Sequence, residues 1–174
     1  MRSLYTDALT LEPQVAAHAD EMFQVLSDPA IYEYENAPPA SVEWLRNRFS
    51  KLEARQSADG QELWLNWVIR LPSGELIGYV QATVFPDHQA TVAYELASPH
   101  WGKGLARRAV EAMIRELAST YQVRSLSAEL KQANLRSRRL LERLGFRPVD
   151  PSAVPDASPV LPDEWRMERE LEGP

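Results

Sequence analysis

The stretch SPHWGKGLARRAV, residues 98–110, constrains the fold more than any other segment of the chain. It follows the β-type run QATVAYELAS and leads directly into apolar residues with helical spacing. A strand that passes through a short loop into a helix points the unpaired N–H groups of the first helical turn at one place. Gly102 and Gly104 allow the backbone to approach a ligand closely. The segment therefore predicts an α/β fold with an anion site at this helix start.

The spacing of this loop excludes two common nucleotide sites. Lys103 lies between the glycines and no hydroxyl residue follows it, whereas a P-loop needs Gly-Lys followed by Ser or Thr. A dinucleotide loop needs a small residue where Arg107 stands, and an acidic residue about 20 positions further on. The stretch around Tyr121–Val123 supplies no such residue. A phosphate loop of another kind and an ordinary tight turn both remain open.

Periodicity and turn signals predict the order strand, two helices, three strands, helix, strand, helix, two strands. Ser41 and Asn134 stand at the N-cap positions of the second and fourth helices. Several strands are apolar on both faces, which requires cover on both sides of the sheet. We therefore expect one mixed α/β sheet of about seven strands between helices, in a single domain over residues 1–174. The predicted segments are 9–12, 15–28, 41–56, 62–71, 75–85, 89–98, 105–117, 123–130, 134–144, 147–149 and 164–171.

Charge is unevenly distributed along the chain. Residues 101–150 carry eleven Lys and Arg against five Asp and Glu, although the net charge of the whole chain is −6. A basic segment in an acidic protein argues against general nucleic-acid binding, which needs a wide positive surface. It fits a confined site for one polyanionic ligand, or a solvated helix face with exposed arginines.

The absence of cysteine excludes disulfides, thiolate zinc sites and a cysteine nucleophile. The three histidines lack metal-ligand spacing, so we expect no metal, and His100 is expected at the surface. No apolar run approaches the roughly 18 residues of a membrane span. The N-terminal residues lack the apolar core of a signal peptide. We expect a cytoplasmic protein with no membrane partner, either a monomer or a homodimer.

Two motifs give the chain a resemblance to a known family. They are YELASPHWGKGLARRAVEAM, residues 94–113, and NLRSRRLLERLGF, residues 134–146. The chain resembles the GNAT superfamily of N-acetyltransferases, in the branch similar to ribosomal-protein N-terminal acetyltransferases. Residues 101–106 match the family's Q/R-x-x-G-x-G/A pyrophosphate loop in register, with Trp101 in place of the usual Gln or Arg. Asn134-x-x-Ser137 resembles the second cofactor motif.

The resemblance implies a mostly antiparallel acyl-CoA N-acyltransferase fold and a direct attack of an amine on the thioester of acetyl-CoA. It implies that the pantetheine arm lies along the strand Tyr94–Ala97, where the family has a bulge that splays two strands apart. The amides of residues 102–106 would hold the diphosphate, with Arg108 as a further nearby cation. The residues it assigns to the cosubstrate are Leu96, Ala97, Trp101, Gly102, Lys103, Gly104, Leu105, Ala106, Arg107, Asn134, Ser137 and Arg138.

The catalytic groups follow the family pattern less closely. Many members carry Glu where this chain has Thr91, so Glu95, on the same strand face unless a bulge intervenes, is the candidate general base. Alternatively, Glu95 has no catalytic role and is an exposed carboxylate or one paired with an arginine. Glu33 and Glu35 are further candidates for the base. Backbone N–H groups near Leu96 are the expected oxyanion donors. Ser137 is expected to face the cleft, as a contact of coenzyme A or as the acid for the thiolate, or else to serve its own helix.

Three functions are candidates for this chain. The first is an N-acetyltransferase acting on a protein N-terminus or a small-molecule amine. An α-amino group, with a pKa of about 8 against about 10.4 for lysine, depends less on a strong base. The second is a non-catalytic acyl-CoA-binding or sensing domain, which the loss of acid at Thr91 favours. The third treats RSRRLLERLGF as a DNA-binding helix, and the net charge and the leucines argue against it.

Overall fold

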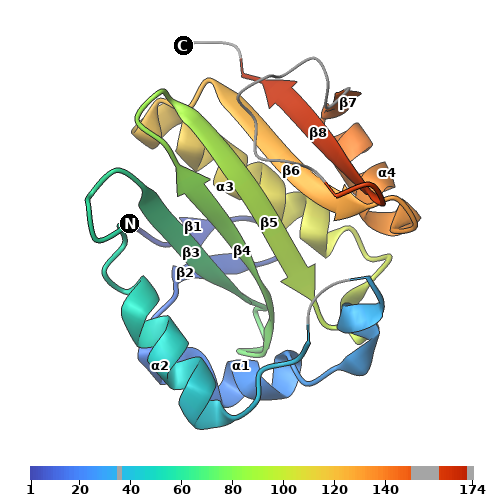
Figure 1. The fold of residues 1–174 in the computed structure, drawn as a ribbon. Coiled ribbons are helices and arrows are strands. Elements are labelled where there is room, and N and C mark those ends of the chain that lie inside the picture. The colour runs from blue at the N-terminus through green and yellow to red at the C-terminus, as the bar shows by residue number, and fades with distance from the viewer. Residues whose placement is uncertain (35–36, 150–160, 172–174) are drawn as a thin grey trace.

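One mixed sheet organises the chain in a computed structural model that describes residues 1–34, 37–149 and 161–171 (Figure 1). The strand order is β1-β2-β3-β4-β5-β6-β8-β7. Neighbouring strands are antiparallel except for the parallel pair β5 and β6. The strands are β1 (Leu4–Tyr5), β2 (Thr10–Pro13), β3 (Leu63–Arg70), β4 (Leu76–Val84), β5 (Gln89–Leu96), β6 (Ser125–Lys131), β7 (Arg147–Val149) and β8 (Glu164–Glu170).

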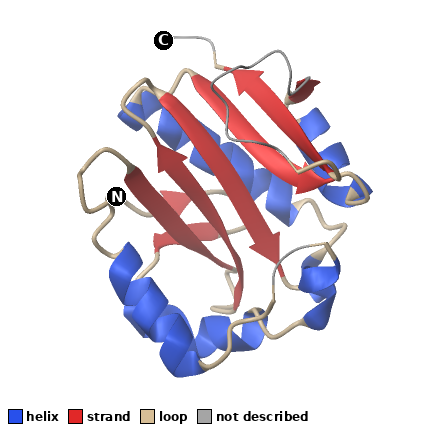
Figure 2. Cartoon of the chain, in the orientation of Figure 1, coloured by secondary structure: helices blue, strands red, loops and turns tan. Residues whose placement is uncertain are grey.

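Helices cover both faces of the sheet, as the sequence predicts (Figure 2). The helices α1 and α2 pack on one face, and α3 and α4 pack on the other. Trp67, Val68 and Ile69 of β3 are fully buried although they alternate between the two faces, because each face has its own apolar core. The α-helices are α1 (Ala19–Val25), α2 (Val42–Leu52), α3 (Leu105–Tyr121) and α4 (Leu135–Arg143), and the short 3-10 segments are η1 (Ala16–His18), η2 (Pro29–Glu33) and η3 (Ser98–His100).

Most predicted elements are confirmed, and the differences have local causes. The Ser41 hydroxyl caps α2 by accepting from the Trp44 N–H at 3.0 Å. The continuous helix predicted over residues 15–28 is wrong, because its first turn is the separate 3-10 segment η1. The two-residue strand β1 was not predicted, since two residues are too short to show alternation. None of the helices in the described residues has the length and apolar character needed to cross a membrane.

The strands β5 and β6 separate after Thr91, less than halfway along β5. Their parallel pairing runs only from Gln89 to Thr91. Beyond that point β5 continues to Leu96 without β6, and β6 pairs with β8 on its other side. The peptide groups of β5 that would have bonded to β6 are thereby left at an open edge.

The prediction of a bulge in the strand 94–97 is wrong, because β5 pairs with β4 without one. The register of these two strands is uninterrupted from Val84 opposite Ala90 to Gly78 opposite Leu96. A register shift occurs instead one strand away, where β4 pairs with β3 next to Ile69. Thr91 and Glu95 therefore lie on the same face of β5, and the strands separate without an extra residue in β5.

Gly78 sets how closely β4 approaches the end of β5. A Cβ atom built at this position would lie 2.0 Å from the Glu95 carbonyl oxygen and 2.9 Å from the Leu96 Cα. Both are backbone atoms, so a side chain cannot be accommodated by a rotamer change. Any larger residue has to push the open end of β5 away from β4.

Replacing Gly78 with Ala should therefore lower the free energy of unfolding by about 1–3 kcal/mol, as overpacking in a closed site does. Urea unfolding of the variant measures this. Gly60→Ala is the control, since a Cβ there meets nothing within 4 Å and only its φ of +70° opposes the change. A Gly78→Ala protein as stable as the wild type would contradict the close approach.

Candidate active site

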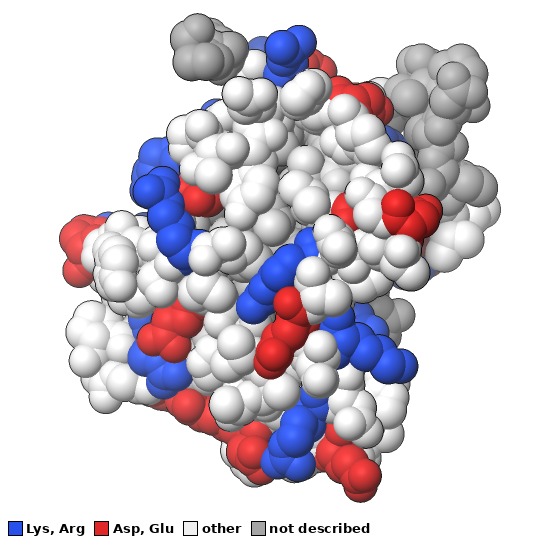
Figure 3. Space-filling view, turned by 90° about the vertical axis from the view of Figure 1, so that its left-hand side faces the viewer, with Lys and Arg blue, Asp and Glu red and all other residues white. Residues whose placement is uncertain are grey.

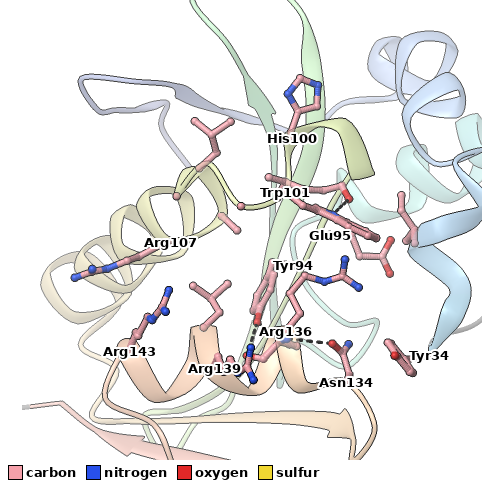
Figure 4. Close-up of a pocket in the computed structure, with 18 residues that line it drawn as sticks. Tyr34, Tyr94, Glu95, His100, Trp101, Arg107, Asn134, Arg136, Arg139 and Arg143 are labelled. Atoms are coloured by element: carbon pink, nitrogen blue, oxygen red, sulfur yellow. Dashed lines mark hydrogen bonds between the residues drawn. The ribbon is translucent and has the colours of Figure 1, made fainter.

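A pocket of about 570 Å³ opens where β5, α3 and α4 meet (Figure 4). Its size is ordinary for a small-molecule site, where cavities of about 300–1,000 Å³ are usual. The segment η2 adds residues on the far side of β5. The lining residues are Ile31, Tyr34, Tyr94, Glu95, Leu96, His100, Trp101, Gly102, Gly104, Leu105, Ala106, Arg107, Asn134, Arg136, Ser137, Arg139, Leu140 and Arg143.

The pocket passes around the open edge of β5 and so joins the two faces of the sheet. Tyr94 and Glu95 are consecutive strand residues and point to opposite faces, yet both line the pocket. Tyr94 faces α4, whereas Glu95 lies on the side of η2. There, burial together with the nearby Glu95 carboxylate raises the pKa of Tyr32 to about 12. A ligand on one face can thus meet a ligand on the other at this edge.

The glycine loop supplies open backbone at the start of α3. Gly102 and Gly104 have φ angles of +72° and +74°, and a Cβ at either would meet nothing within 4 Å. The glycines are therefore required by the backbone conformation and not by crowding. The first turn of α3 contains no acidic side chain, so its N–H groups and the helix dipole present uncompensated positive charge to the pocket.

Trp101 lies between the loop and α4. Its indole N–H donates to the Leu96 carbonyl at 2.8 Å. On its ring, the guanidinium carbon of Arg136 stands 3.4 Å from the centroid. The residue that replaces the family's usual Gln or Arg therefore holds a cation in the pocket by stacking instead of carrying one itself.

A hydrogen-bonded chain closes α4 onto β5. The Tyr94 and Ser137 hydroxyl oxygens are 2.7 Å apart. The Ser137 N–H donates to the Asn134 side chain at 3.0 Å, which confirms the predicted N-cap. Ser137 lines the pocket, so its predicted inward orientation is confirmed as well. These contacts hold β5 and α4 together where the strand ladder has ended.

The arginines of the pocket come chiefly from one face of α4. Arg136, Arg139 and Arg143 recur at the i, i+3 and i+7 spacing of a helix stripe, and Arg107 faces them from α3. Figure 4 shows Arg107 and Arg143 at the end of the pocket opposite Glu95. By contrast, basic and acidic side chains are interspersed on the face drawn in Figure 3.

The structure brings most of the residues predicted for the cosubstrate into the pocket and leaves a few outside it. The predicted residues that line it are Leu96, Trp101, Gly102, Gly104, Leu105, Ala106, Arg107, Asn134 and Ser137, together with Glu95. Those outside the lining are Ala97, Lys103, Arg108 and Arg138. Arg108 pairs with Asp7 at 2.6 Å. Arg138 bonds to Glu142 at 2.9 Å and stacks on Trp165 at 3.7 Å.

Several pocket residues were missed from the sequence. Arg143 was not considered, although it continues the helical stripe of Arg136 and Arg139, and that spacing is the signal that finds it. The prediction that His100 is a surface residue is wrong, because its side chain is only 13% exposed and its Nε2 lies 3.3 Å from the Glu75 carboxylate. Of the other base options, Glu33 is outside the pocket lining and lies 3.9 Å from Arg136, and Glu35 lies outside the described residues.

One carboxylate connects the η2 segment to η3, the turn that precedes the glycine loop. Asp28 accepts the Ala30 N–H at 3.0 Å, which caps η2, and the Ser98 N–H at 2.6 Å, at the start of η3. Desolvation works against the charged form, but the hydrogen bonds from Ser98 and Ala30 prevail and lower the pKa of this carboxyl. Within the described residues, no cluster of three or more His, Asp or Glu side chains could hold a metal ion.

Comparison with known proteins points to one family. Residues 8–147 match the family model described as "Acetyltransferase (GNAT) domain". An uncharacterized N-acetyltransferase, p20, of Bacillus licheniformis is 29% identical over 150 residues, which span 84% of this chain and 83% of the relative.

Solved structures share the fold across nearly the whole chain. A ribosomal L7/L12 α-N-protein acetyltransferase, RimL, solved with coenzyme A, has a TM-score of 0.80 at 16% identity, covering 97% of this chain and 98% of that one. A ribosomal-protein-S5-alanine acetyltransferase from Vibrio fischeri has a TM-score of 0.78 at 19% identity, covering 97% and 96%.

Asp28→Ala should lower the free energy of unfolding at pH 7 by about 1–2 kcal/mol, because two helix-start N–H groups lose their acceptor. Since the folded-state pKa lies below the ordinary value of 3.8, the stabilisation is complete above that value and is lost as the pH falls through the lower, folded-state pKa. Urea unfolding at pH 7 and pH 3 measures the difference. Asp20→Ala, which removes an exposed ion pair with Arg46, is the control. An equal loss at both pH values would contradict the assignment.

Proposed function

Because the chain belongs to the acetyltransferase (GNAT) domain family, and is thus an acyltransferase of a family that uses acetyl-CoA, we propose that it acetylates a primary amine. The acceptor is a protein N-terminus or a small-molecule amine. The observation that carries this proposal is the pocket around the edge of β5, which joins an arginine-lined end to the Glu95 carboxylate. A donor and an acceptor entering from opposite faces of the sheet meet there.

The residues present fit a phosphate-bearing donor. The open first turn of α3 and the glycines at 102 and 104 form a cradle for a diphosphate. Arg107, Arg139 and Arg143 stand beside it to neutralise the phosphates. Acetyl-CoA supplies the thioester that is attacked. We place its pantetheine arm along the open edge of β5, where the peptide groups have lost β6.

Glu95 is the proposed general base. The ammonium form of an amine cannot attack a thioester, so a proton must leave before or during the reaction. The Glu95 carboxylate lies at the acceptor side of the pocket and takes this proton directly or through a water molecule. An α-amino group, with a pKa of about 8, needs less help than a lysine side chain.

A backbone N–H and a side-chain hydroxyl are proposed to act on the two sides of the thioester, its oxygen and its sulfur. The Ala97 N–H donates to Ile77 of β4, so by the alternation of a strand the Leu96 N–H points to the open side. We propose that it donates to the thioester oxygen as negative charge develops there. Ser137, whose hydroxyl is paired with that of Tyr94, is the proposed proton source for the departing thiolate.

The names of the two structural relatives support an α-amino acceptor. Both are named as acetyltransferases of ribosomal proteins, and one is named for the protein α-amino group. At sequence identities of 19% and 16% these likenesses show a shared fold, so the acceptor class named for them is carried over here as a proposal.

Gly104→Trp should abolish acetyl-CoA binding, because the side chain would occupy the cradle at the start of α3. Isothermal titration calorimetry measures binding, and release of free thiol in the presence of amines measures transfer. Gly60→Trp is a matched control, since Gly60 has a similar φ of +70° and similarly open surroundings. Binding that survives Gly104→Trp overturns the cradle. Binding by the wild type without amine-dependent thiol release would indicate a sensor instead.

Glu95→Gln should lower kcat/KM by about 10²- to 10⁴-fold, the usual contribution of a general base. It should also remove the acidic limb of the pH–rate profile, because glutamine has no titrating proton. The control is Glu129→Gln, which changes a partly exposed side chain of β6. An unchanged pH–rate profile would remove Glu95 as the base and leave the acceptor to lose its proton to solvent.

A further inference from the structure

Arg136 presents a guanidinium whose hydrogen-bonding edge is available to a ligand. It stacks face-on on Trp101, with 3.4 Å between the guanidinium carbon and the ring centroid. Stacking engages the flat face of a guanidinium and leaves the N–H groups in its plane. Within the described residues no side chain accepts a hydrogen bond from it, and its ion pair with Glu33 is long, at 3.9 Å. The side chain is 45% exposed and lines the pocket.

This cation stands at the acceptor end of the pocket. Trp101, on which it lies, is anchored to the Leu96 carbonyl, one residue after Glu95. Figure 4 shows Arg136 reaching from α4 toward the same ring beside which Glu95 lies. A fixed positive charge and the proposed base are thus neighbours, whereas Arg107 and Arg143 lie at the other end.

We propose that Arg136, backed by Trp101, binds a carboxylate that the acceptor carries close to its reactive amine. The inference rests on the proposed function and narrows its acceptor. Glu95 faces the ammonium group before it loses its proton, and Arg136 faces the negative group beside it, so the pair is complementary to a zwitterion. The carboxylate is either the α-carboxylate of a free amino acid or the side chain of an acidic residue that follows a peptide N-terminus.

A planar, bidentate guanidinium is well matched to this task. Two parallel N–H···O bonds to a carboxylate give direction as well as attraction, which an ammonium group would not. Trp101 fixes the plane of the guanidinium, so less side-chain freedom is lost when the ligand binds. A ligand carboxylate would replace Glu33 as the partner of Arg136. The Glu33 side chain is 58% exposed and is readily solvated when released.

The test compares acceptors that differ only in this carboxylate. Alanine is paired with alaninamide, and the dipeptide amide of alanine followed by aspartate is paired with that of alanine followed by asparagine. The kcat/KM of each is measured for the wild type, Arg136→Gln and Arg138→Gln. Arg138 is the matched control because it is also an α4 arginine stacked on a tryptophan, at 3.7 Å from Trp165, but lies outside the pocket. Differences in amine pKa cancel when each acceptor is compared between variants.

Arg136→Gln should lower kcat/KM about ten- to hundred-fold for the carboxylate-bearing member of at least one pair, the worth of a hydrogen-bonded charge pair. The loss should fall on the KM of the acceptor and spare the amide member, and Arg138→Gln should change neither. The pair that responds identifies the source of the carboxylate. An equal loss for both members, with a raised KM for acetyl-CoA, would assign Arg136 to the donor and overturn the inference. An unchanged preference would overturn it too.

A binding measurement keeps the inference separate from the proposed function. Calorimetry with coenzyme A present compares N-acetylalanine with N-acetylalaninamide, and the corresponding N-acetylated dipeptide amides, on the same three proteins. A carboxylate preference of the wild type that Arg136→Gln removes supports the inference even if no acceptor in the panel is acetylated. The same affinity for both members of both pairs overturns it. Thiol release with the amide acceptors alone would uphold the proposed function while this inference fails.

Discussion

The site depends on the point at which β5 and β6 stop pairing. The last paired residues, Thr91 and Ser127, also join their hydroxyl groups at 3.0 Å. Up to that point the sheet is closed, and beyond it a strand edge inside the molecule is available for a ligand. An unpaired edge is normally a hazard because its N–H and C=O groups lack partners. Here β4 holds the other side of β5 in unbroken register, so the strand stays in place although β6 has left it.

Two contacts keep that edge at a fixed distance from its surroundings. Gly78 lets β4 pack against the Glu95–Leu96 backbone on one side. On the other side, the Tyr94 and Ser137 hydroxyl groups connect β5 to α4 where the ladder has ended. These contacts therefore keep the opening between β5 and α4 from closing and from widening. The arginines of α4 add positive charge to one of its walls.

The sequence predicted the parts of this site that are local. The helix beginning after Gly104 and the cap at Asn134 depend on neighbouring residues, and both are where their patterns place them. The position of the bulge depends on how β3 and β4 pair, which local alternation does not encode, and it was predicted one strand away from where it lies. The low exposure of His100 is likewise a tertiary property, and the carboxylate nearest to its Nε2, that of Glu75, comes from a distant part of the sequence.

The two hydrogen bonds of Asp28 connect the η2 segment to the start of η3, the turn that leads into the glycine loop. The segment proposed to face the acceptor is thereby hydrogen-bonded to the turn that precedes the loop proposed to hold the donor, so a shift of one relative to the other breaks a charged contact. Anyone who grafts the 29–34 segment of another sequence onto this scaffold to alter its selectivity would have to carry Asp28 along with it. A graft of this segment should therefore begin at residue 28, one residue before η2 starts.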